Sequence, residues 1–255
     1  MAGQASAIKS HLFRCIGSVH ADAMMRTFCF VFALFIALAL PAHAGPLEDA
    51  QAAYERRDYD TALSLFQPLA EQGDAEAQYS LGLMHRYGQS VKQDYAKAAK
   101  WYRRAAEQGH FKAQTNLGRL YNNGQGLPLD YVMAVKWFRK AADQGTAYAQ
   151  SNLGSMYADG HGVEQDYGEA VEWYRLAAEQ GNDLGQYNLG NMYANGQGVP
   201  KDLVQAHMWL DLASASRSLS VIAAQSRDAL AEKMNPAQIA KARRMAGEWM
   251  EKHQQ

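Results

Sequence analysis

The sequence has only two cysteines, Cys15 and Cys29, and both precede Ala44. The chain after Ala44 therefore contains no thiol, so it has no disulfide, no cysteine-based metal site and no cysteine nucleophile. Packing alone must hold that part together. The chain also lacks an excess of charge of either sign, because its formal net charge is −1 at pH 7. A near-neutral chain gives no electrostatic reason to expect nucleic acid or an anionic membrane as a partner.

Long apolar runs are absent except for one near the N-terminus. Residues 28–40 are apolar, Arg26 precedes them, and Pro41-Ala42-His43-Ala44 follows. A positive flank, a short apolar core and an Ala-x-Ala site predict a signal peptide that is cleaved after Ala44 and exports the chain to the periplasm or beyond. The alternative is an uncleaved anchor, although the run is short for a membrane span. Met24 and Met25 lie just before the run, so translation can start there or at Met1.

Catalytic and cofactor motifs are missing as well. There is no His-Glu-x-x-His, no Gly-x-Ser-x-Gly and no Gly-x-x-x-x-Gly-Lys in the sequence. The recurring Gly-x-Gly loops join two predicted helices and lack the preceding strand of a nucleotide-binding loop. We predict no catalytic residue, no metal ligand and no cofactor.

What the sequence does have is a repeat. Four of its tryptophans stand 36 residues apart, and glycines and aspartates keep the same interval. The repeating residues include Trp101, Trp137, Trp173, Trp209, Gly109, Gly145 and Gly181. A fixed period of this size is typical of a stacked array. Four units, 74–109, 110–145, 146–181 and 182–217, align without gaps.

Each unit contains two helical patterns. In the third unit, Ala149, Leu153 and Met156 lie on one face of a first helix, and Ala170, Trp173 and Ala177 lie on one face of a second. The aspartate before the second helix (Asp94, Asp130, Asp166, Asp202) is placed as an N-cap, and the glycine after it as a left-handed C-cap. Each Trp is expected to fill the space between neighbouring helix pairs.

The full pattern, Ala-x-x-Asn-Leu-Gly-x-x-Tyr-x-x-Gly-x-Gly-Val-x-x-Asp-Tyr-x-x-Ala-x-x-Trp-Tyr-x-x-Ala-Ala-x-x-Gly, resembles the Sel-like repeat, a relative of the tetratricopeptide repeat. The resemblance implies an all-α fold: a right-handed solenoid of antiparallel helix pairs whose first helices line a concave side. We expect residues 46–73 to form an N-terminal tetratricopeptide-like cap, 74–217 the four repeats, and 218–253 two C-terminal capping helices. Ser90 replaces the second loop glycine in the first repeat, so a slightly different turn is expected there.

Binding residues are sought where the repeat varies. On the first helix of each unit, the positions opposite the core stripe differ from repeat to repeat, and we predict that they form a groove for a protein or peptide partner. These positions are Tyr79, Leu83, Arg86, Thr115, Arg119, Asn122, Ser151, Ser155, Tyr187 and Asn191. Asn116, Asn152 and Asn188 recur in step and are predicted to be structural. A solvated face is the alternative interpretation.

Second helices of the first two repeats carry several cations, including Lys97, Lys100, Arg103, Arg104, Lys136, Arg139 and Lys140. We interpret them as a solvated outer face; a docking patch for an acidic protein or envelope polymer is the alternative. The predicted function is a non-enzymatic, exported scaffold or adaptor of the bacterial cell envelope. The competing hypothesis is an envelope hydrolase or ligand-binding protein. Some cysteine-rich relatives have been linked to penicillin binding or hydrolysis, but that resemblance does not extend to this chain, which after Ala44 lacks both their cysteines and an evident nucleophile–base pair.

Overall fold

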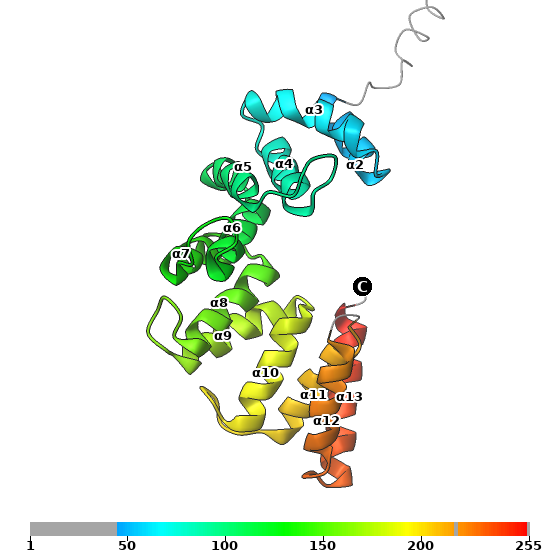
Figure 1. Cartoon of the computed structure of the whole chain (residues 1–255). Helices are drawn as coiled ribbons and strands as arrows, with labels where there is room; N and C mark the ends of the chain where they lie inside the picture. The colour runs from blue at the N-terminus through cyan, green and yellow to red at the C-terminus, as the bar shows by residue number, and fades with distance from the viewer. Residues whose placement is uncertain (1–44, 217–218, 254–255) are drawn as a thin grey trace, which may run out of the picture. The chain divides into compact units, whose positions relative to one another are not determined.

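The computed structural model describes residues 45–216 and 219–253, and all regular structure in these ranges is helical (Figure 1). The predicted signal peptide, residues 1–44, lies outside the described residues. The helices are α2 (Pro46–Glu55), α3 (Tyr59–Glu71), α4 (Ala75–Tyr87), α5 (Tyr95–Glu107), α6 (Phe111–Asn123), α7 (Tyr131–Ala142), α8 (Ala147–Asp159), α9 (Tyr167–Glu179), α10 (Asp183–Asn195), α11 (Leu203–Ser214), α12 (Ser220–Ala231) and α13 (Pro236–His253).

The predicted helix pairs are present in all four repeats. We call α4, α6, α8 and α10 the A helices, and α5, α7, α9 and α11 the B helices. Each A helix packs against the B helix that follows it, and each B helix packs against the next A helix. Figure 1 shows these pairs following one another from α4 to α11. From Asp49 onward the chain is one compact unit, and its architecture is the predicted α-solenoid.

The caps that begin and end these helices agree with the sequence. Asp94 and Asp130 accept hydrogen bonds from the backbone N–H groups of Lys97 and Met133, each at 2.9 Å. Asp166 and Asp202 cap α9 and α11 in the same way. These aspartates satisfy donors that a helix start leaves free. The glycines after the B helices have positive φ, as a left-handed C-cap requires.

Glycine allows the chain to approach closely at two kinds of position. A Cβ at Gly82 on α4 would lie 2.4 Å from the Tyr102 ring, so this glycine lets the A and B helices of a repeat meet. Gly162, in the loop after α8, has φ +72°, and a Cβ there would lie 2.4 Å from the backbone carbon of Tyr131 in the preceding repeat. Ser90 occupies the equivalent place in the first repeat and keeps a left-handed φ of 54°.

Glutamine side chains connect the repeats through a periodic set of hydrogen bonds. Gln78, which is 4% exposed, donates to the carbonyl oxygen of Ala70 at 3.0 Å and accepts from Gln108 at 2.9 Å. The same pair of bonds recurs one repeat later at Gln114 and again at Gln150. Because each glutamine is buried with both ends of its amide paired, the set fixes the register between neighbouring repeats.

The four repeating tryptophans are not equally buried, and three of them, Trp137, Trp173 and Trp209, pack against core clusters. Trp137 and Trp209 are 5% and 7% exposed, whereas Trp101 and Trp173 are half-buried. The guanidinium of Arg104 lies over the Trp101 ring, 4.7 Å from its centroid. The prediction that the indoles fill the spaces between helix pairs holds most fully for Trp137 and Trp209.

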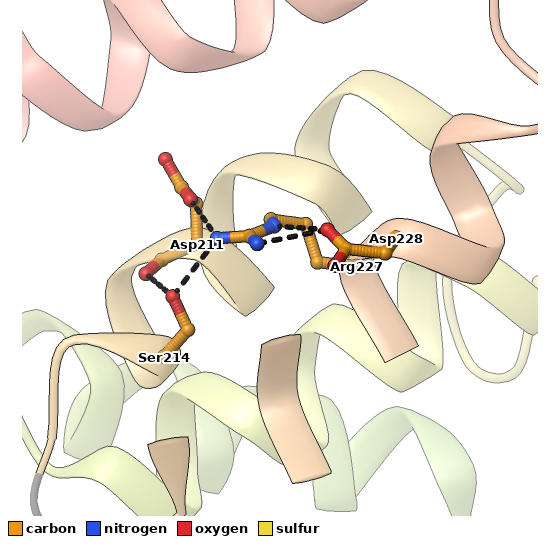
Figure 2. Close-up of polar contacts among 4 residues, drawn as sticks. All are labelled: Asp211, Ser214, Arg227 and Asp228. Atoms are coloured by element: carbon orange, nitrogen blue, oxygen red, sulfur yellow. Dashed lines mark hydrogen bonds and ion pairs between the residues drawn. The ribbon is translucent and has the colours of Figure 1, made fainter. Parts of the chain in front are cut away.

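Both ends of the array are fastened by specific contacts. At the start, the Tyr54 hydroxyl on α2 donates to Gln89 in the first repeat at 2.9 Å. At the end, Arg227 on α12 donates to Asp211 at 2.8 Å and to Ser214 at 3.2 Å on α11, and it also pairs with Asp228 (Figure 2). These bonds hold α12 against the last B helix.

The last helix starts as the sequence predicts. Asn235 and Gln238 form reciprocal bonds at the start of α13, each at 2.9 Å, which is a capping box with Pro236 at the first helical position. Trp249 on the same helix lies edge-on to Trp209, with 6.2 Å between ring centroids. Within residues 45–216 and 219–253, none of the helices has the length and apolar character needed to span a membrane.

Candidate functional site

The A helices form one wall of an open groove of about 630 Å³. We call it the A-helix groove. Its lining residues from the first two A helices are Tyr79, Phe111, Lys112, Thr115, Asn116 and Arg119. Those from α8, α10 and their ends are Thr146, Tyr148, Asn152, Asp183 and Leu184, and Leu219 comes from the segment before α12. Four successive repeats thus contribute to a single concave surface.

Large apolar side chains stand exposed in this groove. Tyr148, at the second position of α8, is 70% exposed, and Phe111, at the first position of α6, is 41% exposed. Leu184 holds the position of Tyr148 one repeat later and is half-buried. Aromatic side chains that remain open to solvent on a concave surface are typical of binding sites.

The Tyr79 side of the groove is rigidly held. The Tyr79 ring stacks on His110, with 4.7 Å between centroids. His110 is itself fixed at both nitrogens, because Nδ1 accepts from the Ala113 backbone N–H at 3.1 Å and Nε2 lies 2.9 Å from a Glu76 carboxylate oxygen. Burial, helped by the nearby Glu76 carboxylate, raises the pKa of Tyr79 to about 12, so its phenol is neutral at ordinary pH.

The predicted groove residues divide into two groups. Tyr79, Thr115 and Arg119 line the groove, although Thr115 is 9% exposed and donates its hydroxyl to the Phe111 carbonyl. The remaining predicted positions lie outside it: Leu83, Arg86, Asn122, Ser151, Ser155, Tyr187 and Asn191.

The second group has structural contacts of its own. Ser151 is fully buried, and Leu83 and Tyr187 pack against core clusters. Ser155 accepts a hydrogen bond from the Tyr174 hydroxyl at 3.1 Å, and Arg86 donates to the Asn116 side chain. These five side chains contact other parts of the solenoid.

The structure also identifies groove residues that sequence reasoning missed. Lys112, Tyr148 and Leu184 occupy one repeat position, two residues into each A helix, and Glu76 holds it in the first repeat. This position is as variable as those chosen, so its variation was a usable signal. Asn116 and Asn152, predicted to be structural, do donate to backbone carbonyls four residues earlier, and both also line the groove.

Several cations of the B helices have internal partners. Arg103 donates to the Tyr121 hydroxyl at 2.6 Å, and Arg139 donates to the Tyr157 hydroxyl, which is the equivalent bond one repeat later. The Lys140 ammonium lies 5.0 Å from the Trp137 ring centroid. Three of these cations therefore contact the solenoid itself.

Stacked helix pairs with an open groove along their A helices define this molecule as an α-solenoid repeat protein. The chain belongs to the Sel1 repeat family, which it matches over residues 51–74, 75–110, 111–146, 147–182 and 183–217. The first match, residues 51–74, covers most of residues 46–73, the segment predicted to be an N-terminal cap. Proteins of this family are helical scaffolds that generally mediate protein–protein interactions and are generally non-enzymatic.

The solved structures that are similar to this chain include the following two. The Sel1 repeat protein from Oxalobacter formigenes is 28% identical, with a TM-score of 0.66 over 89% of this chain and 98% of that one. The protein c5321, a protective antigen present in uropathogenic Escherichia coli strains, is 32% identical, with a TM-score of 0.57 over 82% of this chain. This chain spans 53% of c5321, about half its length. No curated protein matches the chain.

Proposed function

We propose that this protein is an exported, non-enzymatic adaptor of the bacterial cell envelope that holds a partner protein or peptide in the A-helix groove. The observation that carries the proposal is the set of exposed aromatic side chains, Phe111 and Tyr148, inside a groove of about 630 Å³. Exposing such side chains to water is unfavourable unless a partner covers them. Export is supported by the apolar run at residues 28–40 and the Ala-x-Ala site that follows it.

Site-specific photo-cross-linking in bacterial cells that make the full chain tests the proposal. Tyr148 is replaced by a photoreactive phenylalanine analogue, and Val132 on α7 receives the same replacement as the control. The two positions are matched, since they are 70% and 65% exposed, and Val132 lies outside the groove. The proposal expects a discrete protein adduct at position 148 and none at position 132. Equal labelling at both positions, or labelling at 132 alone, would contradict it.

The envelope location needs its own measurement. Fractionation of the same cells, combined with mass spectrometry of the mature N-terminus, is expected to find the chain in the periplasm or medium, beginning at Gly45. A chain that stays in the cytoplasm with its N-terminal segment intact would contradict export while leaving the groove as an interaction site.

A further inference from the structure

Two cations in the A-helix groove have no anionic partner. Lys112 and Arg119 both lie on α6, both are exposed, and both line the groove. In the part of the chain that the structure describes, neither side chain makes a hydrogen bond or ion pair. The Lys112 ammonium rests 6.0 Å from the Tyr79 ring centroid and 5.8 Å from that of Phe111. It is therefore held at the groove surface by aromatic rings and not by a carboxylate.

The other polar side chains around these cations are engaged within the protein. Asn116 uses both ends of its amide, since it donates to the Lys112 carbonyl oxygen at 2.9 Å and accepts from Arg86. Thr115 donates to the Phe111 carbonyl oxygen at 2.9 Å. Among the described residues that line the groove, the carboxylate is Asp183 on α10. It accepts a hydrogen bond from the Leu184 backbone N–H at 2.8 Å. The described polar groups on the α6 side of the groove that lack a hydrogen bond or ion pair are thus the two cations, Lys112 and Arg119.

Apolar surface flanks the two cations. Phe111 precedes Lys112 in the sequence. Tyr148, which is 70% exposed, holds the position of Lys112 in the next A helix. Leu184 and Leu219 extend the apolar lining beyond Tyr148. A partner that fits must bring both negative charge and apolar side chains, because either alone would leave half of this surface without a complement.

We propose that the groove binds an acidic peptide segment in which carboxylates stand beside aromatic or aliphatic side chains. This inference rests on the proposed function and names its partner class. Carboxylates of the segment pair with Lys112 and Arg119, and its apolar side chains cover Phe111 and Tyr148. Arg119 is suited to bidentate pairing with a carboxylate.

The spacing of the cations gives the proposal a sharper form. Lys112 and Arg119 are seven residues apart on one helix, so their Cα atoms are separated by about 10 Å along its axis. A peptide in the polyproline II conformation rises about 3.1 Å per residue with about three residues per turn, so two acidic residues three positions apart span nearly the same distance and lie on one face. The preferred segment therefore has two acidic residues separated by two others, with an apolar residue between or beside them.

Selection from a phage-displayed library of random decapeptides tests the inference on the full mature chain. The comparison is between the wild type and a Lys112→Glu/Arg119→Glu variant. The control is Lys100→Glu/Lys136→Glu, which makes the same change of charge at two exposed cations on B helices outside the groove. Circular dichroism of all three proteins confirms folding. Fluorescence anisotropy with the selected peptide then measures Kd.

The expected result is enrichment of acidic peptides with aromatic or aliphatic residues on the wild type and on the control. The groove variant is expected to bind the selected peptide at least about 30-fold more weakly, since each lost charge pair contributes roughly 1 kcal/mol or more. Enrichment of basic or uncharged peptides, equal binding by the groove variant, or no enrichment at all would overturn the inference. An adduct at position 148 in cells would still support the adaptor role in any of those cases, so the two failures are distinguishable.

Discussion

The side-chain amide of Gln144 donates to the side-chain oxygen Oε1 of Gln114, thirty residues earlier, at 2.8 Å. Gln114 is 3% exposed and donates in turn to the Ala106 backbone carbonyl oxygen at 3.1 Å. One buried amide thus joins three segments, the end of α5, the A helix α6 and the end of α7. A relationship of this kind recurs in three repeats and ties each repeat to the next.

Substitution of Gln114 by Leu is expected to destabilise the protein by about 1–3 kcal/mol, because it removes two hydrogen bonds, the one that Gln114 donates to Ala106 and the one that it accepts from Gln144. Gln144→Leu removes one of these two bonds and keeps the bond from Gln114 to Ala106, so its cost should be about half as large. Urea unfolding of both variants measures the difference. Equal costs for the two variants would mean that the buried amide does not fix the register.

Gly162 and Gly145 form a matched pair for testing contact between repeats. Both have positive φ, +72° and +85°, but a Cβ at Gly162 would overlap the backbone of Tyr131, whereas nothing lies within 4 Å at Gly145. Gly145→Ala should cost about 1 kcal/mol from its left-handed backbone alone. Gly162→Ala should cost at least about 2 kcal/mol more, because of the overlap. Thermal unfolding compares them, and similar melting temperatures would show that the loop does not pack as described.

The tryptophans are expected to differ in their contribution to stability. Trp137 is 5% exposed, so Trp137→Ala should cost about 3–5 kcal/mol. Trp101 is half-buried beneath Arg104, and Trp101→Ala should cost less than half of that. Chemical denaturation of both variants decides the point; a larger loss at Trp101 would contradict the burial seen here.

Stability should fall at acidic pH because of a buried histidine. His207 is 1% exposed, and burial lowers the pKa of His207 below its ordinary value of 6.5, although Asp211 partly opposes the shift. The unfolded chain therefore takes up a proton that the folded chain resists. Above about pH 6.5 this proton uptake does not affect the free energy of unfolding. Below that pH the free energy of unfolding decreases as the pH falls. Burial also lowers the pKa of His85, which adds to the decrease.

Urea unfolding at about pH 7.5 and about pH 5 checks this expectation. The loss of stability between the two conditions should be smaller in His207→Leu than in the wild type. His253→Gln, at an exposed position near the C-terminus, serves as the control and should keep the wild-type loss. If His207→Leu and the wild type lose the same amount, His207 does not cause the pH dependence.

Much of the fold follows from the sequence because its determinants are local. An aspartate before each B helix caps that helix wherever it occurs, and Asn235 with Gln238 begins α13 through contacts three residues apart. Because the same buried positions recur in every repeat, each repeat packs on the next in the same way. The glutamines recur with the same period, but the sequence alone does not show that Gln114 and Gln144 meet in space and form a hydrogen bond.

The groove was only partly predictable from the same pattern. Helical periodicity selects one face of each A helix and predicts Tyr79 and Arg119 on it, and both residues line the groove. It does not say which turns of that face remain open once neighbouring A helices pack together. Ser151 shares the predicted face yet is fully buried, whereas Tyr148, three residues earlier, is 70% exposed. That difference depends on the packing of successive repeats, which no single helix encodes.

A charge-exchange experiment tests the binding account most directly. The acidic peptide selected on the wild type and the same peptide with its carboxylates replaced by lysines are titrated against the wild type and against Lys112→Glu/Arg119→Glu, with anisotropy as the readout. We predict that the wild type binds only the acidic peptide and that the variant binds the lysine peptide more tightly than the acidic one. A variant that still prefers the acidic peptide would place the binding site elsewhere and contradict the account.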